Sequence, residues 1–103
     1  MKVWNIKAGA DIISCENKDV PVFLKGSGVC VWSDKKKDIL TFNGLMENYN
    51  GLLIKFKSDL FEVEQKYIQN NGKLIISSSI KNITDYEIKI EKFFPLYNFK
   101  ITS

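Results

Sequence analysis

A chain of 103 residues with a formal net charge of +3 is long enough for one hydrophobic core, and we expect residues 1–103 to form a single β domain. The chain has no histidine, and because lysine accounts for all 15 basic residues it has no arginine either. These absences exclude Ser-His-Asp and Cys-His catalysis and histidine-ligated metal sites. They also remove the bidentate guanidinium that proteins favour for phosphate and guanine.

The first 19 residues predict a strand followed by a turn. Residues 3–8 alternate with Trp4 and Ile6 facing inward, and Ile12-Ile13 extends this strand. The polar residues CENKD at 15–19 predict a turn, which makes Cys15 a loop thiol. The opening MKVWNIKAGAD lacks the apolar segment of a signal peptide, and no apolar run is long enough to span a membrane as a helix, so we expect a cytoplasmic protein.

Residues 20–32 predict a hairpin around Gly26-Ser27 with Phe23 opposite Cys30. Both faces of this hairpin are apolar, whereas a strand in a two-layer fold has one face toward water. Either another part of the chain covers the second face, or a partner or a second copy does. Both interpretations remain open, and Trp32 lies on the face that needs a cover.

The segment NGLMENYNG at 43–51 follows a strand over 38–43 and precedes another over 52–57. Its turn-forming residues predict an irregular loop with one helical turn over residues 45–49. The loop carries Leu45, Met46 and Tyr49, which are residue types found in cores and in protein interfaces. The segment therefore either plugs one end of the fold or contacts a partner.

Residues 61–92 alternate apolar and polar side chains with a period of two, which indicates antiparallel strands with one buried face. Asn71-Gly72 predicts a two-residue type I′ turn, because both central positions of that turn need a positive φ. This turn sets Tyr67 opposite Ile76, Val63 opposite Ile80 and Glu62 opposite Lys81.

A second turn at 82–84 would return the chain along the same sheet, with Ile80 opposite Tyr86 and Ile76 opposite Ile90. Pro95 cannot donate a hydrogen bond to a sheet, so it marks a break or an edge. Residues 97–101 then alternate in a last strand. With eight or nine short strands, the chain predicts an all-β fold. We expect an antiparallel β-sandwich, immunoglobulin-like or jelly-roll-like, with a small closed β-barrel as the alternative.

No motif predicts catalytic, cofactor-binding or metal-binding residues, so we expect no enzyme and no cofactor. Cys15 and Cys30 fall short of the four ligands of a structural zinc site. Glu62 and Glu64 lie on the wet face beside lysines, and not across a cleft as a pair of catalytic carboxylates does.

The sequence therefore favours a small protein-binding module that acts by steric masking, such as an inhibitor, an immunity-type protein or a phage or mobile-element accessory protein. Self-association through residues 20–32 is a further option. The expected partner surface consists of Phe23, Trp32, Leu45, Met46 and Tyr49. The alternative function is a single-stranded nucleic-acid-binding barrel, which we disfavour because Phe61, Tyr67 and Tyr86 fall on the core face.

Overall fold

The computed structural model describes residues 4–8, 13–19, 23–26, 28–48, 51–97 and 100–102, of which 23–25, 47, 48 and 102 are described by their backbone alone. These residues form strands and no helix, so none of the described segments is a helix able to cross a membrane. In chain order the strands are β1 (Trp4–Ala8), β2 (Ile13–Asn17), β3 (Phe23–Gly26), β4 (Gly28–Ser33), β5 (Lys36–Asn48), β6 (Gly51–Lys57), β7 (Phe61–Asn70), β8 (Lys73–Asn82), β9 (Ile90–Tyr97) and β10 (Lys100–Thr102).

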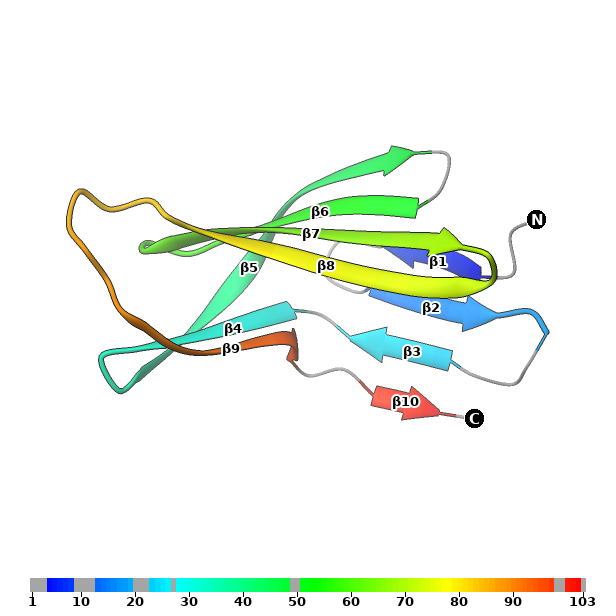
Figure 1. Cartoon of the computed structure of the whole chain (residues 1–103), viewed down its shortest axis with the longest axis horizontal. Helices are drawn as coiled ribbons and strands as arrows, with labels where there is room; N and C mark the ends of the chain where they lie inside the picture. The colour runs from blue at the N-terminus through cyan, green and yellow to red at the C-terminus, as the bar shows by residue number, and fades with distance from the viewer. Residues whose placement is uncertain are drawn as a thin grey trace.

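The strands make two antiparallel sheets that share one core, as expected for a sandwich (Figure 1). The smaller sheet has the order β1-β2-β3-β10, and the larger has the order β8-β7-β6-β5-β4-β9 and curls nearly into a barrel. Ile13 and Cys15 of the smaller sheet pack into the same cluster as Val29, Phe56 and Tyr67 of the larger one. The all-β prediction is confirmed, and the molecule combines features of the sandwich and the barrel.

The predicted hairpin at 20–32 is wrong, because the chain does not turn back at Gly26. β3 and β4 lie end to end, and β3 belongs to the smaller sheet while β4 belongs to the larger (Figure 1). Phe23 pairs with Glu16 and Thr102 instead of Cys30. β10 follows β9 in the same way: Tyr97 lies opposite Gly28 and Lys100 opposite Lys25, so one register continues across the corner. Glycine favours such a corner as much as it favours a turn.

The predicted turn at 15–19 is also wrong over its first three residues. Cys15, Glu16 and Asn17 belong to β2, which pairs with β1 on one side and β3 on the other. Cys15 is fully buried in the core rather than exposed in a loop. The prediction gave too much weight to the polar neighbours of Cys15, which alternate with it toward the outer face of the strand.

The predicted loop at 43–51 is a strand through Asn48. β5 is the longest strand, and it pairs with β4 through its first five residues and with β6 through the rest. A bulge between Phe42 and Gly44 shifts the register where the strand passes from one neighbour to the other. Because a bulge adds a residue and bends the strand, Asn43-Gly44 serves as a bend inside a strand and not as its end.

The hairpin of β7 and β8 has the predicted register throughout, with Tyr67 opposite Ile76 and Glu62 opposite Lys81. Asn71 and Gly72 have φ values of 52° and 79°, as a type I′ turn requires. Phe61 and Tyr67 are fully buried, so their assignment to the core is confirmed.

The second predicted return, along β8, is wrong. Asn82 and Thr84 do form a local turn, in which the Asn82 side chain accepts from Thr84 and donates to the Tyr86 carbonyl. The chain then leaves the sheet, and β9 pairs with β4, at the other end of the same sheet. Tyr86 is 57% exposed, which contradicts its assignment to the core, whereas Phe93 packs against the core. Pro95 lies in β9, an edge strand of this sheet, as expected.

Two glutamine side chains of β7 bond to strands with which β7 does not pair, Gln65 to β9 of the same sheet and Gln69 to β1 of the smaller sheet. The buried Gln65 accepts from the Tyr67 hydroxyl at 2.6 Å and donates to the Pro95 carbonyl of β9 at 2.8 Å and to Ser78 of β8 at 3.1 Å. The side-chain amide of Gln69 accepts a hydrogen bond from the Trp4 N–H at 3.0 Å and donates one to the Trp4 carbonyl at 2.8 Å. It thus pairs with Trp4 as the backbone of a neighbouring strand would. Among the described residues, every buried side-chain polar atom has a hydrogen-bond partner.

We expect Gln65→Met to destabilise the protein by about 2–3 kcal/mol, because it leaves the Tyr67 hydroxyl and the Pro95 carbonyl without their partner. Adding Tyr67→Phe in the same chain removes one of the orphaned groups and is expected to recover about 1 kcal/mol. Urea unfolding of the two single variants and the double variant measures both effects. Strictly additive losses would contradict the proposed coupling.

Candidate functional site

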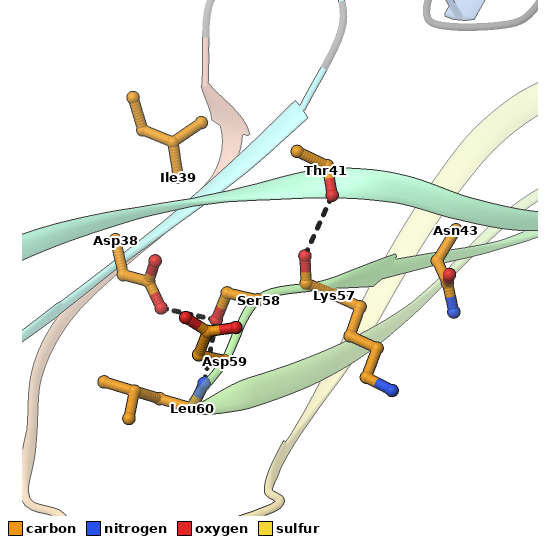
Figure 2. Close-up of a pocket in the computed structure, with 8 residues that line it drawn as sticks. All are labelled: Asp38, Ile39, Thr41, Asn43, Lys57, Ser58, Asp59 and Leu60. Carbon is orange, nitrogen blue, oxygen red and sulfur yellow. Dashed lines mark hydrogen bonds between the residues drawn. The ribbon is translucent and has the colours of Figure 1, made fainter.

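A shallow polar depression of about 630 Å³ lies between β5 and the β6–β7 connection (Figure 2). Asp38 and Ser58 face each other within it, and the Ser58 hydroxyl donates to the Asp38 carboxylate at 2.5 Å. At the other end the Thr41 hydroxyl donates to the Lys57 carbonyl at 3.1 Å.

The contacts of Ser58 are those of a turn. Its oxygen also accepts from the backbone N–H groups of Leu60 and Phe61, at 3.3 and 3.2 Å, and its own N–H donates to the Phe61 carbonyl. A hydroxyl committed to the three bonds that hold residues 58–61 in place is a structural group. Within the described residues, no cluster of three or more cysteine, aspartate and glutamate side chains could hold a metal ion here or elsewhere. The side chains of the depression therefore have a structural role. For a partner, the depression is a shallow polar surface without a deep pocket.

The structure separates the residues of the predicted partner surface. Met46 and Leu45 are 62% and 42% exposed in the second half of β5, and Trp32 is half-buried on β4. Trp32 lies opposite Lys37 of β5. Lys37 precedes Met46 by nine residues, so roughly 25–30 Å of extended strand separates the two positions. The side chain of Phe23 and the whole of Tyr49 lie outside the described residues. The described members thus belong to two regions at opposite ends of β5.

Leu45 and Met46 adjoin apolar side chains that sequence reasoning did not select. Met46 lies opposite Leu53, and Ile68 lies opposite Ile75 on the same outer face, one diagonal step from Leu53. Leu53 and Ile68 are half-buried, and Ile75 is 41% exposed. We call these four residues the apolar strip. Leu45 lies on the opposite face of β5 from Met46, where it faces Ile54. The strip was detectable once the β7–β8 register was known, because Ile68 and Ile75 break the polar alternation of the outer face.

On the outer face of β4, Cys30 is covered by side chains of the neighbouring strands. Cys30 has no exposed surface, and its neighbours across the sheet are Ile39 of β5 and Phe94 of β9. Beside them, the Lys37 ammonium donates to the Tyr97 hydroxyl at 3.2 Å and lies 5.5 Å from the centre of the Tyr97 ring. This hydrogen bond raises the pKa of Lys37. On the apolar second face of β4, Cys30 is therefore covered by side chains of β5 and β9.

Neither cysteine is an activated nucleophile. Both are free and fully buried. Burial raises the pKa of Cys15 to about 12. Burial also raises the pKa of Cys30, although the nearby Lys37 ammonium opposes that shift. Because the thiolate is the reactive form, both thiols are expected to react slowly with alkylating reagents in the folded protein.

The raised pKa of Cys15 predicts a loss of stability at alkaline pH. Between its ordinary value of 9.0 and about 12, the Cys15 thiol ionises in the unfolded chain but stays protonated in the folded one, so ionisation lowers the free energy of the unfolded state as pH rises. We expect this one group to lower the free energy of unfolding by about 2 kcal/mol between pH 8 and pH 10.5. Urea unfolding of the wild type and Cys15→Ala across this range measures it. Parallel pH profiles for the two proteins would show that Cys15 ionises normally in the folded state.

Comparison of this chain with protein-family models, with curated proteins and with solved structures gives no match.

Proposed function

We propose that the protein is a small non-enzymatic protein-binding module that acts in the cytoplasm by steric masking, as an inhibitor, immunity-type protein or mobile-element accessory protein would. The observation that carries the proposal is the apolar strip, together with the exposed Leu45 beside it. The two free thiols agree with a reducing compartment.

The polarity of the outer face of β5–β8 changes sharply along the strands. At the end near the β6–β7 connection the face carries Lys57, Glu62 and Lys81, and in the middle Lys55 forms a salt bridge with Glu64 at 3.7 Å. The apolar strip occupies the other end. An ordinary wet face has scattered apolar side chains, whereas a contiguous apolar group with a charged border is typical of a protein-contact surface.

The edge beside the strip suggests how a partner binds. Among the described residues, the part of β5 from Thr41 to Asn48 pairs only with β6, so its other edge is unpaired. An extended segment of a partner can add to such an edge through backbone hydrogen bonds, and alternate side chains then contact Leu45 on one face and Met46 on the other. Once bound there, this protein covers the partner segment and blocks access to it.

The proposal predicts that one charge in the strip abolishes partner binding. The immobilised protein is used to capture partners from the native host, and the captured protein is identified, purified and titrated. We expect Met46→Glu to raise Kd at least tenfold, because a buried methionine contributes about 1.5–3 kcal/mol and the new carboxylate loses solvation.

Ile101→Glu is the matched control, because Ile101 is 72% exposed on β10 in the other sheet. Ile101→Glu is expected to bind as the wild type does, and circular dichroism checks that both variants are folded. A folded Met46→Glu that binds the purified partner with wild-type affinity would contradict the proposal, as would the failure of the wild type to capture any protein.

A further inference from the structure

A second exposed region lies on the outer face of β4, β5 and β9. Trp32 of β4 lies directly between two lysines, Lys37 of β5 on one side and Lys92 of β9 on the other. The Trp32 side chain is half-buried, and both lysines are exposed. A tryptophan between two lysine positions, on one face of a sheet, combines a stacking surface with positive charge from both neighbouring strands.

Two more rings follow along β9. Phe94, which lies opposite Cys30, is 41% exposed and diagonal to Trp32, and Tyr97 lies further along opposite Gly28. Diagonal neighbours on adjacent antiparallel strands are about 7–8 Å apart, and the register shift between Gly28 and Cys30 places Tyr97 on the same face as Phe94, although the two are three residues apart. We call Trp32, Lys37, Lys92, Phe94 and Tyr97 the lysine–aromatic face.

Lys37 lies over this face rather than extending into solvent, because it contacts the hydroxyl and the ring of Tyr97. Among the described residues, neither Lys37 nor Lys92 forms a salt bridge. The acidic side chains next to these lysines along the chain are Asp34 in the β4–β5 turn, Asp38 on β5 and Glu91 on β9. Of these, Glu91 accepts a hydrogen bond from the Lys35 N–H at 2.7 Å, while Lys35, Lys36 and Lys89 add further positive charge at this end. The region therefore has a positive excess next to exposed rings.

We propose that the lysine–aromatic face binds single-stranded nucleic acid. Bases stack on Phe94 and Trp32, and Lys37 and Lys92 contact the phosphates on either side. A duplex is a poorer ligand because its base faces are already stacked on one another. With no arginine in the chain to read base edges, binding is tolerant of sequence. This site is separate from the apolar strip and does not depend on the proposed protein-binding function.

Fluorescence anisotropy with a labelled 15-nucleotide deoxythymidine oligomer tests the proposal on the full chain. We expect binding at 20 mM NaCl that weakens about 25-fold at 200 mM, since two phosphate contacts give a slope near −1.4 in log K against log salt. Phe94→Ala is expected to weaken binding at least fivefold without changing this slope. Lys92→Gln is expected to reduce the slope by about 0.7.

Phe94→Tyr is the matched control, because it keeps a ring at the same place and is expected to keep most of the affinity. Met46→Glu, in the apolar strip, is expected to bind the oligomer as the wild type does. Lack of binding at 20 mM NaCl would overturn the proposal, and so would equal affinity for a duplex of the same length or an unchanged affinity of Phe94→Ala. Binding of cellohexaose in place of the oligomer, without salt dependence, would assign the rings to a neutral sugar and would also overturn it.

Discussion

The closure of this fold depends on two side-chain amides on the inner face of β7. Gln65 joins β8 and β9, the two end strands of the larger sheet, through Ser78 and the Pro95 carbonyl. Gln69 joins β7 to β1, the end strand of the smaller sheet, through the backbone of Trp4. Apolar packing is tolerant of small shifts, but a buried amide without partners is costly. An apolar sheet could curl in several ways. These bonds therefore favour the curvature in which both glutamine amides have hydrogen-bond partners.

This closure leaves the outer faces and the unpaired edge of β5 for contact with other molecules. The inner faces are occupied by the core and by the two amides, and β5 is the strand that runs through both exposed regions. Its first half contributes Lys37 to the lysine–aromatic face, and its second half carries Met46 of the apolar strip and an unpaired edge. The bulge at Phe42–Gly44 lies where β5 changes neighbours, so the same irregularity that bends the sheet also separates the two regions.

Local turn chemistry was enough to predict some pairings and not others. Asn71-Gly72 demands positive φ at two successive residues, and this requirement alone sets the register of β7 and β8. Gly26-Ser27-Gly28 makes no comparable demand, since glycine suits a hairpin and a corner between sheets equally well. The pairing of β9 with β4 involves strands about sixty residues apart in the chain. Alternation along residues 86–91 predicts a pairing with β8, and nothing in the sequence pattern indicates β4 as the neighbour against which Phe93 packs.

The same limit explains which surface residues the sequence could indicate. Met46 and Leu45 stood out because they break the polar pattern of their own segment, which is a local signal. Phe94 and Tyr97 did not, because their importance comes from Trp32 and Lys37 on strands that become neighbours only in the folded chain. Residues 20–32 needed a second cover, and the structure supplies it around Cys30 with rings and a lysine as well as with Ile39. Side chains that combine rings with positive charge suit a planar, anionic ligand better than an apolar protein surface. The two ends of β5 therefore differ in the chemistry of the ligands that they suit.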